Sequence, residues 1–444
     1  MKNKAILRNL KKWTLCLIPV CFLWSLNSQE SIYPAASFQG TIAITGATIH
    51  IGNGQVIDKG TLIIKNSKIE SVGSNLAIPS GSRVIAVPGS HLYPGLIAAS
   101  TNLGLAEISS VRAVSDFSEI GEYNPSVKTI AAYNAESRVI PTVRSNGVLL
   151  AHITPRGGII SGTSSIVQLD AWNWQDAAYK MNNGIHLNLP AMVNRPSPFA
   201  ALMGQNQGPP VDALKNALIK IEEIRNFFRE AKVYSMKADP LNLKYEAVKG
   251  LFDKSQKLFI HCDLVKEIMI ALDLKKEFNL DVVIVGGSDS WMVADLLKEQ
   301  QVPVILSEPH SLPSTADDAV DQPYKTGFQL KQAGVLFSIS LDANDGYWQQ
   351  RCLPFQAGTL AAYGLTKEEA LSAITLNAAT ILGIDKTTGS LEAGKDANLV
   401  ISQGDILDMK SSKVTHAFIQ GRSIDLNNKH SQLFEKYKYK YGIK

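Results

Sequence analysis

Apolar and polar residues alternate in two parts of the chain, one near each end. Between residues 41 and 87 the alternation predicts short, half-buried strands, and its apolar positions are Ile42, Ile44, Ile49, Ile51, Leu62 and Ile64. A matching pattern returns at residues 395–404 and 413–422. Two β fragments that bracket a large middle region pair most simply with each other. We therefore expect one small β-sandwich domain formed from both chain ends, residues 41–93 and 386–425.

The middle of the chain contains eight apolar runs of strand length. They lie at residues 94–100, 147–154, 163–169, 184–189, 257–262, 281–286, 302–306 and 335–341. Helical patterns separate the later runs, and the last helix is predicted over 365–382, between a Thr366–Glu369 capping box and Gly383. Strands that alternate with helices form parallel sheets. Eight of them predict an α/β fold, a (β/α)8 TIM-like barrel over 94–385, with functional residues at the C-terminal strand ends.

The N-terminal residues have the form of a secretory signal. Five basic residues precede the apolar run WTLCLIPVCFLWSL. At about fourteen residues this run is short of the roughly 20 that a membrane-spanning helix needs. We expect residues 1–28 to be removed, with cleavage near Ser28, on export to the periplasm or the extracellular space. An uncleaved membrane anchor is the alternative.

Removal of this signal changes the charge and the cysteine content of the protein. The loss of five basic and no acidic residues takes the formal charge from +4 to −1. No basic patch then favours nucleic acid as a partner. Cys16 and Cys21 leave with the signal, and Cys262 and Cys352, which have no framework spacing, are expected as buried free thiols rather than a disulfide.

The C-terminal segment FEKYKYKYGIK is short, basic and aromatic. Its composition fits either a binding element or the solvated end of a helix. We interpret it as a solvated helix end.

Three sequence features carry a resemblance to a known family. They are the β fragment before the barrel, the phrase PGLI at 94–97, and the phrase TLNAATILGIDKTTGSLEAGKDANLVI at 375–401. Together they resemble the amidohydrolase superfamily, in particular its imidazolonepropionase-like branch, from about residue 41 to 425. The resemblance implies a hydrolase of carbon–nitrogen bonds in which one or two divalent metals activate a water.

The resemblance also implies a set of metal ligands, which this chain keeps only in part. Where the family has a His-x-His pair after strand one, the chain has Ser100 and Asn102, and Gly286 stands at the strand-six histidine. His261 keeps the strand-five position and Asp342 the strand-eight position, where the aspartate also accepts a proton. Catalytic zinc usually takes three protein ligands from His, Cys, Asp or Glu. We therefore expect a degenerate site, with a zinc-like divalent metal only if other ligands have rebuilt it.

Three further histidines lie near strand C-termini: His152, His186 and His310. One alternative is a relocated metal site made of one of them with His261 and Asp342. The other is a hydrogen-bonded core or rim imidazole, which is favoured for each of the three taken singly. For Asp342 the alternatives are a general base at the barrel mouth and a loop or helix-capping carboxylate.

Two functions follow from these observations. The first is an exported hydrolase of non-peptide carbon–nitrogen bonds, with Asp342 as the catalytic proton acceptor and His261 as ligand or orienting group. The alternative is a non-catalytic barrel that binds a small molecule, with Ser100 and Asn102 as polar contacts to it. In both, the partner is a small molecule, and we expect neither nucleic acid binding nor stable membrane insertion after signal cleavage.

Overall fold

The computed structural model describes residues 33–108, 111–193, 212–313, 315, 317–341 and 346–443. The predicted signal at residues 1–28 lies outside these ranges. The chain divides at Pro34/Ala35 into two units, and the fold below is that of the second, residues 35–444. None of the helices described is long and apolar enough to cross a membrane.

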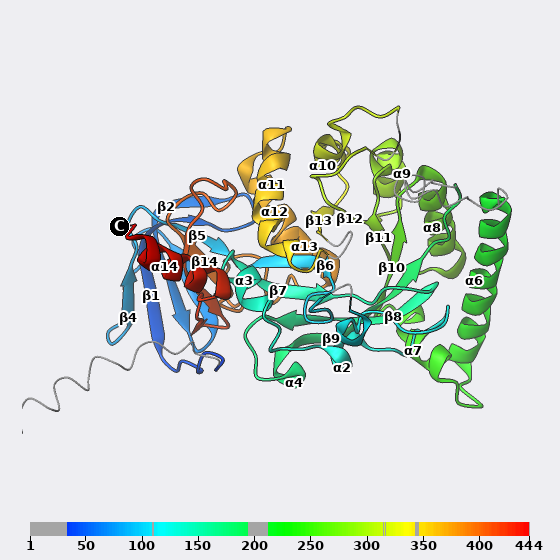
Figure 1. The fold of residues 1–444 in the computed structure, drawn as a ribbon, viewed down its shortest axis with the longest axis horizontal. Helices are drawn as coiled ribbons and strands as arrows, with labels where there is room; N and C mark the ends of the chain where they lie inside the picture. Colours follow the sequence, from blue (N-terminus) through cyan, green and yellow to red (C-terminus); the bar gives the residue numbers. More distant parts are fainter. Residues whose placement is uncertain are drawn as a thin grey trace, which may run out of the picture. The chain divides into compact units, whose positions relative to one another are not determined.

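The outer sheet combines strands from both ends of this unit (Figure 1). Its members are β1 (Thr41–His50), β2 (Val56–Lys65), β3 (Lys68–Gly73), β4 (Arg83–Ala86), β5 (His91–Pro94), β14 (Leu399–Ser402), β15 (Val414–Ile419) and β16 (Arg422–Ser423). They follow the order β16-β15-β14-β5-β1-β2-β3, with β4 beside β1. The junction is the antiparallel pair β5–β14, in which Tyr93 faces Val400. The predicted β-rich domain is confirmed, while its exact boundaries stay a prediction.

The second sheet is an almost closed barrel, and all eight predicted strands are present. They are β6 (Leu96–Thr101), β7 (Val148–Ile153), β8 (Ile160–Gln168), β9 (Ala178–Asn188), β10 (Lys257–Cys262), β11 (Val282–Gly286), β12 (Val304–Leu306) and β13 (Phe337–Ile339), hydrogen-bonded in this order. At the seam, the Ser340 hydroxyl after β13 donates to the Ser100 carbonyl of β6. The prediction of a TIM-like barrel is confirmed.

One strand departs from the predicted parallel sheet. β8 is antiparallel to both neighbours, with Ala151 facing Val167 and Thr163 facing Ile185. The cause is the short connection after β7, where Gly157 and Gly158 take positive φ values of 83° and 64°. A turn of this length joins only antiparallel strands, since a parallel crossover needs a dozen or more residues. The start of β8, rather than its end, therefore lies beside the C-terminal ends of β7 and β9.

Helices accompany the barrel strands, and in Figure 1 α8, α9 and α10 lie outside β10, β11 and β12. The α-helices before α12 are α2 (Thr129–Ala132), α3 (Ile140–Arg144), α4 (Trp174–Ala177), α6 (Ala213–Met236), α7 (Leu243–Phe252), α8 (Val265–Phe278), α9 (Ala294–Glu299), α10 (Gln322–Ala333) and α11 (Leu353–Ala362). Short 3-10 helices cover Arg112–Val114, Ser290–Val293 and Gln349–Cys352.

The single helix predicted over 365–382 is wrong, because the structure has two: α12 (Lys367–Ala373) and α13 (Leu376–Leu382). The predicted ends are present, with the capping box at α12 and a left-handed Gly383 after α13. The helix breaks at Thr375, whose φ of −134° and ψ of −92° are not helical. Just before it, the Ile374 carbonyl accepts a hydrogen bond from Ile97 of β6. Tertiary pairing with the barrel therefore interrupts a locally helical pattern.

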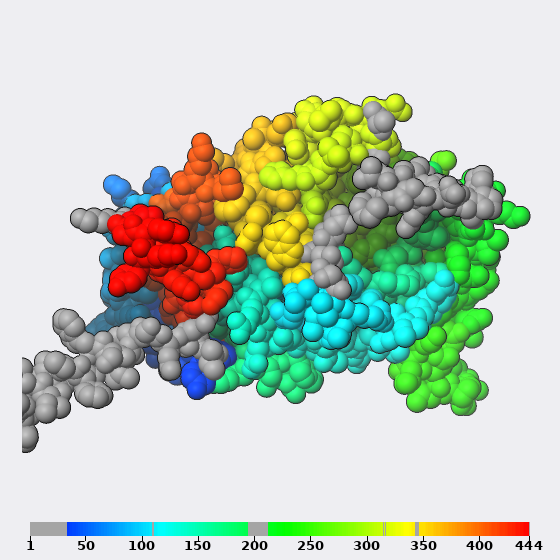
Figure 2. Space-filling view, viewed as in Figure 1, coloured from blue at the N-terminus to red at the C-terminus, as the bar shows by residue number. Residues whose placement is uncertain are grey.

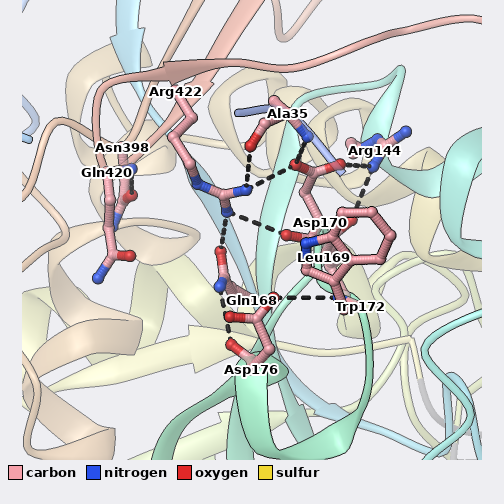
Figure 3. Close-up of polar contacts among 10 residues, drawn as sticks. All are labelled: Ala35, Arg144, Gln168, Leu169, Asp170, Trp172, Asp176, Asn398, Gln420 and Arg422. Atoms are coloured by element: carbon pink, nitrogen blue, oxygen red, sulfur yellow. Dashed lines mark hydrogen bonds and ion pairs between the residues drawn. The ribbon is translucent and has the colours of Figure 1, made fainter. Parts of the chain in front are cut away.

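A buried carboxylate, Asp170, joins the β-rich domain to the barrel (Figure 3). It follows β8, and its Oδ1 accepts from Arg144 Nη1 at 2.6 Å. Its Oδ2 accepts from Arg422 Nη1 of β16 at 3.0 Å and from the backbone N–H of Ala35 at 2.9 Å. Arg422 Nη2 donates to Gln168 Oε1 at 2.6 Å. One carboxylate thus holds segments from the beginning, middle and end of the unit.

We expect the substitution Asp170→Ala to lower the free energy of unfolding by about 3–5 kcal/mol, because it leaves two largely buried guanidinium groups without a counter-charge. Urea denaturation measures the change. Glu70→Ala is the matched control, since it removes an exposed ion pair with Lys65 and is expected to lose only about 0–1 kcal/mol. Equal, small losses in both variants would contradict a joining role for Asp170.

Candidate functional site

The barrel brings three of the four candidate histidines together. His152 on β7, His186 on β9 and His261 on β10 form a row, with ring centroids 5.5 Å apart for the first two and 5.2 Å for the last two. Phe259 lies against this row, stacked on His186 at 4.9 Å. His310 lies elsewhere and contacts the Thr359 hydroxyl at 2.6 Å.

His152 is fully engaged in hydrogen bonds. Its Nδ1 lies 2.9 Å from the Ala99 carbonyl and its Nε2 2.7 Å from the Ser164 hydroxyl. Burial lowers the pKa of His152 to about 3, so the ring is neutral near pH 7. Because a carbonyl only accepts, Nδ1 carries the proton, and Nε2 accepts the one hydroxyl proton of Ser164, which is then not available to the Gly184 carbonyl 3.1 Å away. This arrangement fits the hydrogen-bonded core imidazole and leaves His152 no electron pair for a metal.

His186 and His261 form a direct pair, with His186 Nδ1 2.8 Å from His261 Nε2. Burial, followed by the charges of His261 and His152, lowers the pKa of His186 well below its usual value. The neutral ring carries one proton. Among the described residues its Nε2 has no hydrogen-bond partner. A buried N–H without a partner is rarer than a buried acceptor without one, so the proton belongs on Nδ1 and is donated to His261. The electron pair of His261 Nε2 is therefore in use.

The strand-six ligand position is closed by a carboxylate. Gly286 has φ +102°, and a Cβ there would lie 2.8 Å from Asp263 Oδ1 and 2.9 Å from the Cys262 carbonyl. Asp263 is held in this place by the Ser288 hydroxyl, which donates to Oδ1 at 2.9 Å. A histidine at 286 would require the loop after β10 to move. No sequence motif indicated Asp263, because it occupies no position of the family's ligand pattern.

Ser100 and Asn102 lie at the end of β6 in different environments. The Ser100 hydroxyl lies 3.3 Å from Thr154 Oγ1, and its carbonyl accepts from Gln350 Nε2 at 3.3 Å. Asn102 is fully buried, yet neither atom of its amide has a partner within the described part of the chain. Since buried polar groups are almost always hydrogen-bonded, the Asn102 amide is expected to bind a water molecule or a ligand. The hydrogen bond from Gln350 to Ser100 was not predicted, because Gln350 lies far from Ser100 in the sequence.

The described residues do not fit the zinc site that the resemblance implies. Over the ranges that the structure covers, no three His, Cys, Asp or Glu side chains are placed to hold a metal ion. His261 Nε2 is bonded to His186, and Gly286 offers no ligand. Asp342, predicted as catalytic residue and metal ligand, lies outside the described residues, so its role stays a prediction.

A pocket of about 580 Å³ opens beside His261, at the C-terminal ends of β10 and β11. Its lining residues are Asn188, Leu189, Ala191, Val193, His261, Cys262, Asp263, Leu264, Glu267, Val285, Gly286 and Ser307. Cys262 and Cys352 are both free thiols; Cys262 is buried, as predicted for both, whereas Cys352 is only half-buried. Burial raises the pKa of Cys262 well above its usual value, which argues against a nucleophilic thiolate in this pocket.

Comparisons with known proteins find similarity over part of the sequence and over the whole fold. Residues 328–424 match the model of the amidohydrolase family. An imidazolonepropionase from Symbiobacterium thermophilum is 37% identical over 92 residues, which cover 20% of this chain and 21% of that protein. The chain thus spans about a fifth of the length of this relative. An imidazolonepropionase from Mesorhizobium japonicum is 23% identical over 375 residues, 78% of this chain and 87% of that protein.

A solved structure extends the likeness to the fold. The amidohydrolase from Thermotoga maritima superposes with a TM-score of 0.72 at 24% identity, over 86% of this chain and 99% of that chain. At this identity the likeness establishes the fold alone. It agrees with the barrel and the β-rich domain described above.

We expect Asn102→Leu to leave the free energy of unfolding unchanged or to raise it by up to about 3 kcal/mol, because it removes a buried amide without partners. Asn188→Leu is the matched control. Its Nδ2 donates to the Gly158 carbonyl at 2.9 Å and to the Ser161 hydroxyl at 2.8 Å, so its loss should lower stability by about 1–3 kcal/mol. Thermal and urea unfolding measure both. An equal loss in Asn102→Leu would mean that the Asn102 amide is already satisfied.

Proposed function

Because the chain belongs to the amidohydrolase superfamily, on its imidazolonepropionase-like branch, by its C-terminal segment and its fold, we propose that it is an exported hydrolase of a carbon–nitrogen bond other than an ordinary peptide bond. The observation that carries the proposal is the pocket beside His261. It lies at the C-terminal ends of barrel strands, where TIM-barrel enzymes hold their active sites. Export is supported by the signal-like residues 1–28.

The proposed substrate is a small polar molecule. The Asn102 amide, which is fully buried after β6 and is not part of the lining of the pocket beside His261, offers an NH2 group and a carbonyl that the described residues leave unused, a pair that matches the C=O and N–H of an amide-like group. His261 contributes an imidazole whose orientation is fixed by His186. By resemblance the proton acceptor is Asp342, and Ser100 is a further polar contact.

The superfamily implies a divalent metal, which when bound supplies an activated water. The described residues do not fit such a metal. The imidazole of His261 is already hydrogen-bonded to His186, and the strand-six position is Gly286, which has no ligand atom and packs against Asp263. We therefore assign no step of the reaction to a metal. The chemistry that the chain itself supports is binding and orientation by Asn102 and His261, with proton acceptance by Asp342.

A second function, small-molecule binding without turnover, is favoured by one specific observation. The Ser288 hydroxyl holds Asp263 against Gly286 by a hydrogen bond. The space that the family's strand-six histidine would need is therefore occupied by the Asp263 carboxylate. A barrel that kept its pocket and lost its metal ligands would have this arrangement. The two functions share the site and differ only in turnover.

Hydrolysis of a panel of small amides, cyclic amides and N-acyl amino acids separates them. For a hydrolase, His261→Ala and Asp342→Asn should each lower kcat/KM by about 100-fold or more on any hydrolysed compound, the range of a lost acid–base or orienting group. His310→Ala is the matched control and should retain activity, because its ring contacts Thr359 outside the pocket. Elemental analysis of the same samples should find no metal that is lost specifically in His261→Ala.

Three outcomes would change the account. One equivalent of zinc, manganese or iron that disappears in His261→Ala would contradict the reading of the donor set. Activity that survives both the His261→Ala and the Asp342→Asn substitution would place the reaction elsewhere. Saturable binding of panel compounds that chelators do not affect, with no product formed, would establish the binding function instead.

A further inference from the structure

The last helix of the chain, α14 (Lys429–Tyr441), carries an aromatic face that is open to solvent. Phe434 is 65% exposed, Tyr437 47% and Tyr441 64%. These residues are three or four positions apart and so lie on one side of the helix. Together with Leu433 they line a shallow apolar hollow of about 380 Å³. Contiguous exposed apolar surface of this kind marks interaction sites.

The helix is anchored at its start and exposed along its length. The Asn428 side chain caps it by accepting from the backbone of His430 and Ser431, and its Nδ2 donates to Ser145 Oγ beside α3. None of the thirteen helix residues is buried. Figure 2 shows α14 in red at the surface of the visible face. Isolated helices of this length are marginal in water, so a surface that covers its apolar side would also stabilise it.

Basic residues border the aromatic face. The helix has four lysines, Lys429, Lys436, Lys438 and Lys440, and one acidic residue, Glu435. At 100° per residue, Lys440 and Lys438 fall on opposite sides of the arc formed by Phe434, Tyr437 and Tyr441. The ammonium of Lys440 lies 5.2 Å from the centre of the Tyr441 ring. Positive charge and aromatic surface therefore belong to the same patch, which we call the α14 face.

We propose that the α14 face docks on an anionic lipid surface. Tyrosine and phenylalanine rings settle at the level of lipid headgroups, and lysines beside them attract anionic phosphates. A second copy of this chain is disfavoured as the occupant, because the lysines of two such faces would repel one another. An acidic protein would account for the lysines, but it would not account for exposed aromatic rings aligned along one side of the helix. The inference is independent of the proposed hydrolase function.

Flotation of residues 29–444 with vesicles tests the proposal. The quantity compared is the ratio of the fraction bound to phosphatidylglycerol-containing vesicles to the fraction bound to neutral phosphatidylcholine vesicles. Residues 1–28 are left out because their five basic residues and apolar run would bind anionic vesicles by themselves. We expect binding to favour the anionic vesicles by about tenfold or more and to fall as salt is raised, since each lysine near the surface adds to the attraction.

Two variants and one control separate the parts of the α14 face. Phe434→Ser with Tyr441→Ser removes rings from it, and Lys438→Gln with Lys440→Gln removes its flanking charges; each pair should abolish most of the anionic preference. Tyr439→Ser is the control. Tyr439 is 91% exposed but lies outside the arc, so its loss should leave binding nearly unchanged. Circular dichroism of each variant establishes that the chain is folded.

Hydrogen exchange with and without anionic vesicles locates the contact. Slower exchange of residues 429–443, which is absent in the ring variant, supports the proposal. Equal binding of the ring variant and the wild-type chain would overturn it. So would ring-dependent dimers in ultracentrifugation or ring-dependent binding to an acidic polypeptide, if either occurs without any preference for anionic vesicles.

Discussion

The buried carboxylate of Asp170 is the centre of a charged contact between the two sheets. Arg422 belongs to the outer sheet and Arg144 to the helix before β7, and both donate to this one side chain. Burial of two guanidinium groups without a counter-charge would strongly destabilise the fold, and Asp170 supplies a counter-charge to both. The same sheet supplies β5, which continues through Gly95 into β6. β6 contains Ser100 and ends just before Asn102, so the outer sheet is directly continuous with the strand that leads to these two residues.

A row of three imidazoles, rather than a cluster of metal ligands, occupies the described part of the barrel mouth, and burial keeps His152 and His186 neutral near pH 7. His152 is held by Ala99 and Ser164, and His186 donates to His261. Below them, Phe259 belongs to an apolar cluster shared with Ala379 and Leu382 of α13. This apolar cluster favours uncharged imidazole rings, because burial raises the free energy of the charged imidazolium form. Function then depends on hydrogen-bonding groups that face the pocket.

The sequence predicted the architecture well where local pattern and tertiary pairing agree. All eight barrel strands and the two-ended β-rich domain were visible as periodicity and motifs. β8 was wrongly predicted as parallel, because the apolar pattern of a strand does not reveal its direction. Only the short turn at Gly157 and Gly158 indicated that β8 runs antiparallel. The break at Thr375 was missed because it depends on pairing of Ile374 with Ile97. At the site, resemblance predicted His261, Ser100 and Asn102, whose roles stay predictions, while the contacts of Asp263 and Gln350 come from packing between distant loops, which no local pattern encodes.

Nitrogen-15 NMR of the imidazole rings near pH 7, before and after addition of one equivalent of Zn²⁺, measures whether a hydrogen bond from His186 occupies His261 Nε2. We expect His186 to be the Nδ1–H tautomer, coupled through the hydrogen bond to His261 Nε2, and we expect both signals to be unchanged by zinc. A proton found on His186 Nε2, or a zinc-dependent shift of His261 Nε2 to a metal-bound value, would contradict this expectation.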